Sequence, residues 1–265
     1  MKKLDCDVEA RYIEEEGLTM GICIQLSAAT CVYGDVKANL ATIEREAELA
    51  KNANVDLVLF GEAFLQGFDS MTFNYHHDAD VTFGLGSVPI AHLRKMASDY
   101  SVGIGVGFYE NDHGAFYSSY LVIDKRGKIV HRYRRASEGW KLPGANADYR
   151  EGNDFLPFEF EDVKMGVLIC GDLWEDHLLK AIADLDAHVE CILWPVHTDY
   201  SIDEWEGGVR KEYIERASIL GAHVFFVNNY VQHEDLAKGG AYVWYQGREL
   251  AALSPGHPGR LLFDY

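Results

Sequence analysis

Residues 167–174 read Val-Leu-Ile-Cys-Gly-Asp-Leu-Trp, an apolar run that stops at a cysteine, a glycine and an acid. The pattern predicts a buried strand that delivers a thiol to a sharp turn, where a helix can begin. Residues 55–62 read Val-Asp-Leu-Val-Leu-Phe-Gly-Glu and bring a carboxylate to the end of a second strand in the same way. A thiol and a carboxylate at strand ends are the parts of a nucleophile and its base.

The composition argues against several classes of protein. The chain has 265 residues, 48% of them hydrophobic, and a formal net charge of -18 at pH 7. This charge argues against nucleic acid and anionic membranes as partners, because both bind through basic patches. No apolar run reaches the ~18 residues of a membrane-spanning helix, and the first residues show no apolar secretion signal. We therefore expect a soluble, cytoplasmic protein.

The cysteines and histidines do not form a metal or disulfide pattern. There are five cysteines, an odd number, and no two have C-x-x-C spacing. Zinc-site and disulfide-framework interpretations are therefore weak, and reduced thiols are expected. The adjacent His76 and His77 have no third ligand at a recognisable spacing, so no metal site is predicted.

The order of strands and helices predicts one domain with an N-terminal extension. Residues 1–17 are polar and acidic and are expected outside the core, and residues 18–265 are expected to form the domain. Helices should begin after Asp35 and Ser87, near Glu175 and at about residue 208. The strands and helices alternate in two similar halves, which predicts mixed sheets with helices outside and, if the sheets stack, four layers. Residues 134–154 lose all periodicity and predict a long, functional loop.

Four motifs, taken in order, resemble those of the nitrilase or carbon–nitrogen hydrolase superfamily. They are a glutamate strand at 56–62, a lysine strand at 127–135, a cysteine elbow at 164–172 and a glycine-rich hairpin at 239–250. The resemblance runs from about residue 20 to the end of the chain. It implies an α/β fold in the form of a four-layer αββα sandwich, a small-molecule amide substrate, no cofactor, and a homodimer or larger homo-oligomer. It also implies a Glu-Lys-Cys triad.

Within this pattern Cys170 is interpreted as the nucleophile and Glu62 as the proton acceptor. A helix N-terminus just beyond Cys170 should lower the pKa of its thiol. Glu62 follows five apolar strand residues, so partial desolvation should raise the pKa of its carboxyl group towards neutrality. The alternatives are a buried structural thiol and an acid that caps a loop.

The third component of the triad is open, because Arg135 occupies the position of the family lysine. The backbone N–H of Gly171 is one candidate donor to an oxyanion, and a cation should be the other. Arg135 could serve directly, although its side chain is longer than that of lysine and its forked guanidinium group does not release a proton. Lys141 in the loop could reach the site instead, or turnover could have been lost. A second departure is Gly61, which stands where the family usually has proline.

Four residues are candidates for the substrate pocket: Phe68, Trp174, Trp194 and His197. Core packing explains each of them equally well, since most aromatic side chains are buried for that reason. Leu173 and Trp174 follow the nucleophile where family members that bind acidic substrates often carry arginine, which argues against a carboxylate-bearing carbamoyl amino acid.

Three functional hypotheses follow. The first is a hydrolase of non-peptide C–N bonds in a small amide, acting through a thioester on Cys170. The second is a catalytically silent binding or regulatory protein on the same scaffold, which the arginine at position 135 favours. The third is a glutaminase subunit that supplies ammonia to a separate partner.

Overall fold

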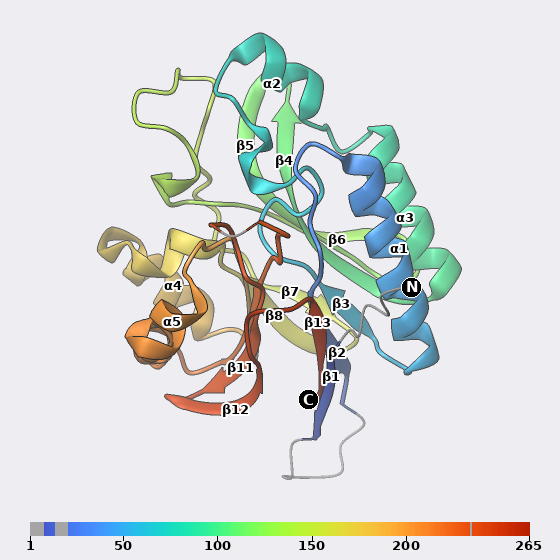
Figure 1. The fold of residues 1–265 in the computed structure, drawn as a ribbon, viewed down its shortest axis with the longest axis vertical. Coiled ribbons are helices and arrows are strands. Elements are labelled where there is room, and N and C mark those ends of the chain that lie inside the picture. The colour runs from blue at the N-terminus through green and yellow to red at the C-terminus, as the bar shows by residue number, and fades with distance from the viewer. Residues whose placement is uncertain (1–7, 14–20, 234) are drawn as a thin grey trace.

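The computed structural model describes residues 8–13, 21–233 and 235–265, which form two sheets with helices on their outer faces (Figure 1). Within these residues the first sheet has the strand order β1-β13-β2-β3-β4-β5-β6. The second sheet has the order β12-β11-β10-β9-β8-β7. The strands of the first sheet are β1 (Val8–Ile13), β2 (Cys23–Ala28), β3 (Leu57–Leu59), β4 (Gly103–Asp112), β5 (Ala115–Ile123), β6 (Ile129–Arg134) and β13 (Gly259–Asp264). Those of the second are β7 (Phe158–Phe160), β8 (Val163–Val167), β9 (Cys191–Val196), β10 (His223–Asn228), β11 (Ala241–Tyr245) and β12 (Arg248–Leu253).

The helices lie outside this pair of sheets. They are α1 (Val36–Asn52), α2 (Tyr75–Val81), α3 (Val88–Tyr100), α4 (Leu179–Asp186), α5 (Ile202–Glu204) and α6 (Arg210–Ala217). Figure 1 shows α1 and α3 side by side on one side of the molecule and α4 and α5 on the other. None of the helices in the described ranges combines the length and the apolar character needed to cross a membrane.

Three apolar clusters hold the four layers together. The cluster between the sheets contains Leu26 and Leu59 from the first sheet and Val167 and Leu193 from the second. The outer clusters bury the inner faces of the helices, with α1 and α3 on the first sheet and α4 and α6 on the second. Because each sheet is apolar on both faces, it must be covered on both, and the αββα order predicted from the sequence is confirmed.

Local signals explain where the first helices begin. Asp35 caps α1 by accepting a hydrogen bond from the backbone N–H of Ala38 at 2.9 Å, which satisfies one of the free amides of the first turn. Helix α3 begins after Ser87 with Pro89 in its first turn, as predicted, although the Ser87 hydroxyl makes no cap hydrogen bond. The long loop is also as predicted, since residues 135–157 contain only one short helical turn, η2 (Glu138–Trp140).

The structure differs from the sequence prediction at three places. Residues 8–13 were expected outside the core but form β1, which pairs in parallel with β13 at the edge of the first sheet. Strand pairing uses backbone groups, so it needs no apolar pattern. The helix expected near Glu175 begins only at Leu179. The helix expected from about residue 208 is α6, which begins at Arg210 after a π-helical turn, η5 (Trp205–Val209).

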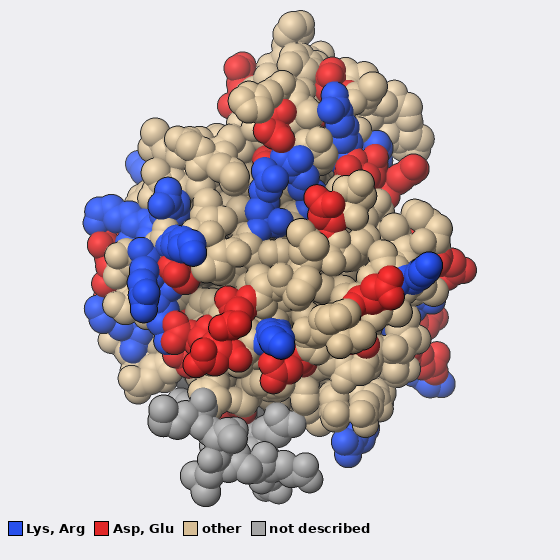
Figure 2. Space-filling view, turned by 180° about the vertical axis from the view of Figure 1, so that it is seen from behind, with Lys and Arg blue, Asp and Glu red and all other residues tan. Residues whose placement is uncertain are grey.

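Charged residues of both signs share the surface. Figure 2 shows acidic and basic side chains interspersed on the face opposite to that of Figure 1, so no surface of a single sign covers this face. The net charge of -18 is therefore not gathered into one continuous field on this side.

His131 on β6 is a partly buried base whose titration should affect stability. Its ring stacks on Phe158 with centroids 4.5 Å apart, and its Nε2 has no hydrogen-bond partner in the described chain. Burial lowers the pKa of His131 from 6.5 to about 4. Because the pKa is lower in the folded protein than in the unfolded chain, the neutral ring favours the folded state. This contribution to the unfolding free energy is complete above pH 6.5 and is lost as the pH falls towards 4.

We expect His131→Phe to resist acid better than the wild type. The shift of about 2.5 pKa units corresponds to roughly 3 kcal/mol, so between pH 7 and pH 4.5 the wild type should lose about 2 kcal/mol more unfolding free energy than the variant. Urea unfolding at both pH values measures this. His113, whose side chain is almost fully exposed, supplies the control His113→Phe, which should behave as the wild type does. Equal acid losses in all three proteins would contradict the assignment.

Candidate active site

Cys170 lies at a strained turn three residues after the end of β8. It begins the short helical turn η3 (Cys170–Trp174) and has a φ of +43°, in the left-handed region that costs energy for a residue with a side chain. Its carbonyl accepts a hydrogen bond from the indole N–H of Trp194 at 2.9 Å, which helps to hold this conformation. The thiol lies 3.7 Å from the carbonyl oxygen of His197.

The side chain of Asp172 holds the same turn through hydrogen bonds. Its two carboxylate oxygens accept four hydrogen bonds from three segments of the chain, and the side chain is completely buried. The donors are the backbone N–H groups of Ile169, Ala136 and Ser137 and the hydroxyl of Tyr133, at 2.7 to 2.9 Å. This carboxylate therefore joins the end of β8 to the segment that carries Arg135.

Glu62 follows β3 and is fully buried. Its backbone N–H donates to the carbonyl of Val196 at 3.1 Å, and its carbonyl accepts from Nδ2 of Asn229 at 2.7 Å. Both contacts come from the second sheet, so the glutamate is held across the sandwich. The departure at Gly61 has a steric reason, because a Cβ there would lie 2.4 Å from Oδ1 of Asn229.

Arg135 and Glu62 form a buried ion pair. Nη1 of Arg135 donates to Oε1 and Oε2 of Glu62 at 2.9 and 3.1 Å, and Nε donates to the hydroxyl of Ser137 at 2.7 Å. The hydroxyl of Ser118 donates to Oε1 of Glu62 at 2.8 Å. Burial alone would lower the pKa of Arg135, but the charges of Glu62 and Cys170 outweigh it and the pKa is raised, so the guanidinium stays protonated.

The thiol of Cys170 carries its proton in the resting protein. Burial raises the pKa of Cys170 to about 12, the charge of Arg135 opposes this, and the charge and hydrogen bond of Glu62 add to it. The prediction of a lowered thiol pKa was therefore wrong, because desolvation outweighs the helix N-terminus and the cation together. A neutral thiol beside a carboxylate needs that carboxylate to remove its proton during attack.

The other cation that the sequence offered is engaged elsewhere. Nζ of Lys141 donates to the carbonyl of Tyr149 at 3.0 Å and pairs with the carboxylate of Glu151 at 2.6 Å. It makes no contact with Glu62 or Cys170. Of the two candidates, only Arg135 is brought to the site.

The four pocket candidates separate into two groups. The ring of Phe68 stacks on His197 with centroids 4.7 Å apart, next to the carbonyl that contacts the thiol. Trp174 is 39% exposed and stands edge-on to Tyr213, whose pKa is raised by burial and by its neighbour Cys170. Trp194, for which pocket and core were equally plausible, is wholly buried in the core, since β9 is covered on both faces.

Sequence reasoning missed several residues that shape this site: Ser118, Ser137, Asp172 and Asn229. Asp172 stands inside the quoted cysteine motif, and its place two residues after Cys170 was a usable signal. Ser118 is in the middle of a strand and carries no signal of its own, because its role depends on a partner 56 positions away.

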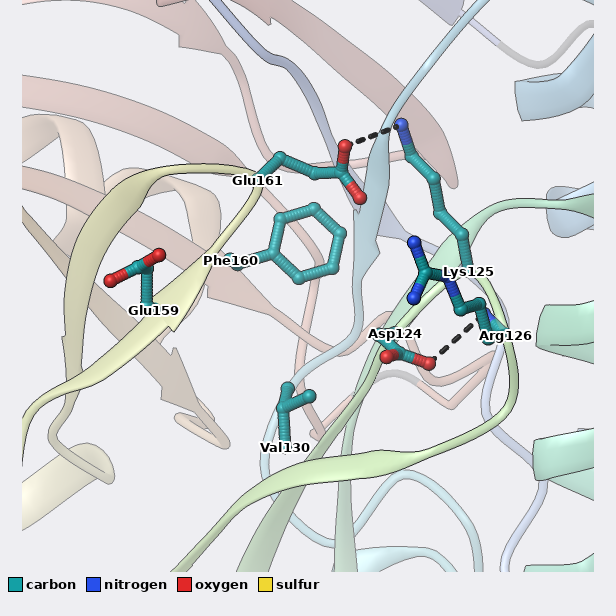
Figure 3. A pocket seen from close by; sticks show the side chains of 7 residues that line it. All are labelled: Asp124, Lys125, Arg126, Val130, Glu159, Phe160 and Glu161. Atoms are coloured by element: carbon teal, nitrogen blue, oxygen red, sulfur yellow. Dashed lines mark hydrogen bonds and ion pairs between the residues drawn. The ribbon is translucent and has the colours of Figure 1, made fainter.

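No metal or second catalytic cluster emerges elsewhere in the part of the chain that the structure describes. Within those residues no three His, Cys, Asp or Glu side chains form a possible metal site, and His76 and His77 lie in α2. A cavity of about 190 Å³ lies between the β5–β6 and β7–β8 turns (Figure 3). Two of the charged residues that line it, Lys125 and Glu161, pair with each other at 3.5 Å.

Comparison with known proteins decides the family. The carbon–nitrogen hydrolase family matches residues 23–229. The chain belongs to this family. It is 26% identical over 247 residues to an aliphatic nitrilase of Rhodococcus rhodochrous, covering 79% of this chain and 65% of that protein. It is 29% identical over 165 residues to an N-carbamoylputrescine amidase of Solanum tuberosum, covering 58% of this chain and 52% of that protein.

Solved structures agree with the fold. An amidase of the nitrilase superfamily from Nesterenkonia AN1 superposes with a TM-score of 0.77 at 20% identity, over 94% of this chain and 93% of that one. The matched region spans about half to two thirds of the length of the curated relatives named above. Within the family, the arginine at position 135 remains the departure that matters most for the site, because it contacts the glutamate directly.

We expect Asp172→Asn to destabilise the protein strongly. In asparagine an NH₂ group replaces one of the two carboxylate oxygens, and the two N–H or O–H groups that donated to that oxygen lose their acceptor. The loss of two charge-assisted hydrogen bonds should cost roughly 3 kcal/mol of unfolding free energy. Tyr133→Phe removes only one of the four and should cost about 1 kcal/mol. Urea unfolding of both variants tests this, and a loss in Asp172→Asn no larger than that in Tyr133→Phe would contradict the role of Asp172.

Proposed function

We propose that this protein hydrolyses the C–N bond of a small amide through a thioester on Cys170. The observation that supports the proposal best is the position of Glu62. One buried carboxylate accepts hydrogen bonds from Arg135 and Ser118, and it lies close enough to Cys170 for its charge to raise the pKa of the thiol. A base beside a nucleophile and held by further groups is the arrangement that nucleophilic catalysis needs.

In the first half of the reaction the sulfur of Cys170 attacks the amide carbon while its proton passes to Glu62. The carbonyl oxygen becomes an oxyanion, and the C–S bond forms. The C–N bond then breaks as Glu62 returns the proton to the leaving nitrogen, which departs as ammonia or an amine. The acyl group remains on Cys170 as a thioester.

In the second half a water molecule replaces the amine. Glu62 takes a proton from this water as it attacks the thioester carbon, and the second tetrahedral intermediate collapses with loss of the sulfur. The thiol regains its proton from Glu62, and the carboxylic acid leaves. The net reaction is amide plus water to acid plus amine.

Arg135 would act by charge alone. It is permanently protonated, so it takes no part in proton transfer. Its guanidinium stabilises the carboxylate of Glu62 in the resting protein and the oxyanion during attack. Gly171 contributes the second donor, since the first N–H groups of a helical turn have no partner within that turn.

The alternative is a silent binding protein on the same scaffold. The arginine at position 135 and the high thiol pKa favour it, because both depart from an activated thiolate beside a lysine. Against it stands the strained φ of Cys170, because backbone strain of this kind gathers at functional sites, active sites among them.

Trapping of the acyl-enzyme separates the two. The protein is incubated with aliphatic, aromatic and N-carbamoyl amides and with nitriles, and released ammonia is measured. Acid quenching and peptide mass spectrometry should find an acyl group on the Cys170 peptide and none on the Cys191 peptide. Hydroxylamine should remove the group as a hydroxamate. If no compound yields ammonia or an adduct, the silent alternative is correct.

Self-association, expected from the family resemblance, remains a prediction. Analytical ultracentrifugation of the purified chain tests it, with a single monomer boundary at micromolar concentration as the contradicting result.

A further inference from the structure

The guanidinium of Arg135 leaves one nitrogen uncommitted. Nη1 and Nε are fixed by Glu62 and Ser137, whereas Nη2 makes no hydrogen bond with any described residue. The side chain as a whole is only 4% exposed. Two anchored nitrogens of a planar group determine the position of the third, so Nη2 is held in place without a partner of its own.

Two glycines from separate segments surround this nitrogen. A Cβ on Gly171 would lie 2.6 Å from Nη2, and a Cβ on Gly139 would lie 2.9 Å from it. Real Cβ atoms essentially never approach another heavy atom this closely. The end of an arginine normally moves aside, but here movement would break the contacts with Glu62 and Ser137.

The backbone does not require glycine at either position. Neither Gly139 nor Gly171 lies in the left-handed region, and both belong to short helical turns, η2 and η3, in which alanine is ordinarily the better residue. Gly139 is moreover exposed to solvent. Space for the guanidinium is therefore the physical reason for glycine at position 139. At position 171 the same space is shared with Ser137, whose Oγ would lie 2.9 Å from the added Cβ.

We propose that Gly139 and Gly171 are positioning residues for the catalytic cation, forming a cradle that places Nη2 of Arg135 beside the nucleophile turn. The cradle fits an arginine and not the shorter, unforked lysine of the family pattern. This inference rests on the proposed function in one respect, namely that Nη2 and the N–H of Gly171 together receive the oxyanion of the amide.

The placement explains how an arginine can work where a lysine is usual. Gly171 is the residue directly after Cys170, and Nη2 would lie 2.6 Å from a Cβ built on Gly171, so this nitrogen is near the residue whose backbone N–H we assign to the oxyanion. The substrate oxygen would then meet one neutral and one charged donor. Loss of one such donor typically costs ~10²–10³ in rate.

A double-mutant cycle tests the cradle. The proteins are Gly139→Ala, Gly171→Ala and Arg135→Lys, with the two combinations that join each alanine to lysine. In the arginine background each alanine should lower kcat by ~10² with KM changed less than about threefold. In the lysine background, which has no Nη2, Gly139→Ala should cost less than about threefold, whereas Gly171→Ala still meets Ser137 and should keep part of its cost. Gly86→Ala, whose Cβ would meet nothing within 4 Å, is the control and should leave both constants unchanged.

Melting temperatures supply a readout that needs no substrate. In the protein with Arg135, Gly139→Ala should lower the melting temperature by about 3 °C. In the Arg135→Lys protein, the same substitution should leave the melting temperature unchanged or raise it. The difference in melting temperature between the two backgrounds is expected even if the protein hydrolyses no amide. The melting temperatures therefore test the cradle, and the hydrolysis rates test the proposed function. If Gly171→Ala does not fold, the Gly139 arm decides alone. Equal effects of an alanine in both backgrounds, on kcat and on melting temperature, would overturn the inference.

Discussion

Cys170→Ala should reduce amide hydrolysis at least ~10⁴-fold while the protein remains folded. The sulfur forms the only bond to the substrate in the proposed reaction, and nothing in an alanine methyl group can replace it. The strained φ of +43° remains, and one partly buried sulfur is lost, so the melting temperature should change by only a few degrees. Initial rates of ammonia release, followed with the best amide of the panel, measure the effect.

Cys191→Ala is the matched control for this variant. Cys191 is also a thiol on the second sheet, but it is fully buried in the cluster between the sheets. We expect its replacement to lower stability slightly through the small cavity and to leave kcat within about threefold. Hydrolysis that persists in Cys170→Ala at a comparable rate would mean that the thiol is not the nucleophile.

Glu62→Gln should reduce kcat by roughly 10³-fold. The amide keeps the size and much of the hydrogen bonding of the carboxylate but does not accept the proton of Cys170, and general bases contribute ~10²–10⁴ in rate. Removing the negative charge also leaves Arg135 buried without its counter-ion, which should cost about 3 kcal/mol of unfolding free energy. The stability loss therefore has to be separated from the loss of chemistry.

The chain contains a second ion pair that makes this separation possible. Glu110 is buried, accepts from the hydroxyl of Ser119 at 2.7 Å and pairs with Arg134 at 2.8 Å. Ser119 and Arg134 are the direct neighbours of the two residues that contact Glu62, and successive strand residues face opposite sides of the sheet. Glu110→Gln should therefore lower stability in a similar way while kcat stays within about threefold. Comparable activity losses in both variants would show that Glu62 acts only through stability.

Much of the fold follows from local pattern. The alternation of apolar strands with capped helices predicted the four layers, and the start of α1 at its Asp35 cap was correct to the residue. The two strand-end motifs also pointed to the groups that meet. The strands before these two groups, β3 and β8, lie in different sheets, so their meeting depends on how the sheets stack.

The environment of each group was much harder to predict. The direction of the thiol pKa shift depends on how completely the Cys170 turn is covered, and burial reversed the expected sign. The choice between Arg135 and Lys141 depended on partners that neither residue reveals by itself. Trp194 was a candidate for pocket or core alike, and the structure places it in the core, where its indole N–H donates to the backbone carbonyl of Cys170.

The amino-acid order alone was thus enough to locate a thiol and a carboxylate at strand ends, because periodicity and turn chemistry act over a few neighbouring residues. The pairing of Glu62 with Arg135, 73 positions away, and the empty space at Gly139 and Gly171 became visible only in three dimensions. Burial, desolvation and steric fit are set by residues that are distant in the chain, so they belong to the folded molecule and not to any one segment of it.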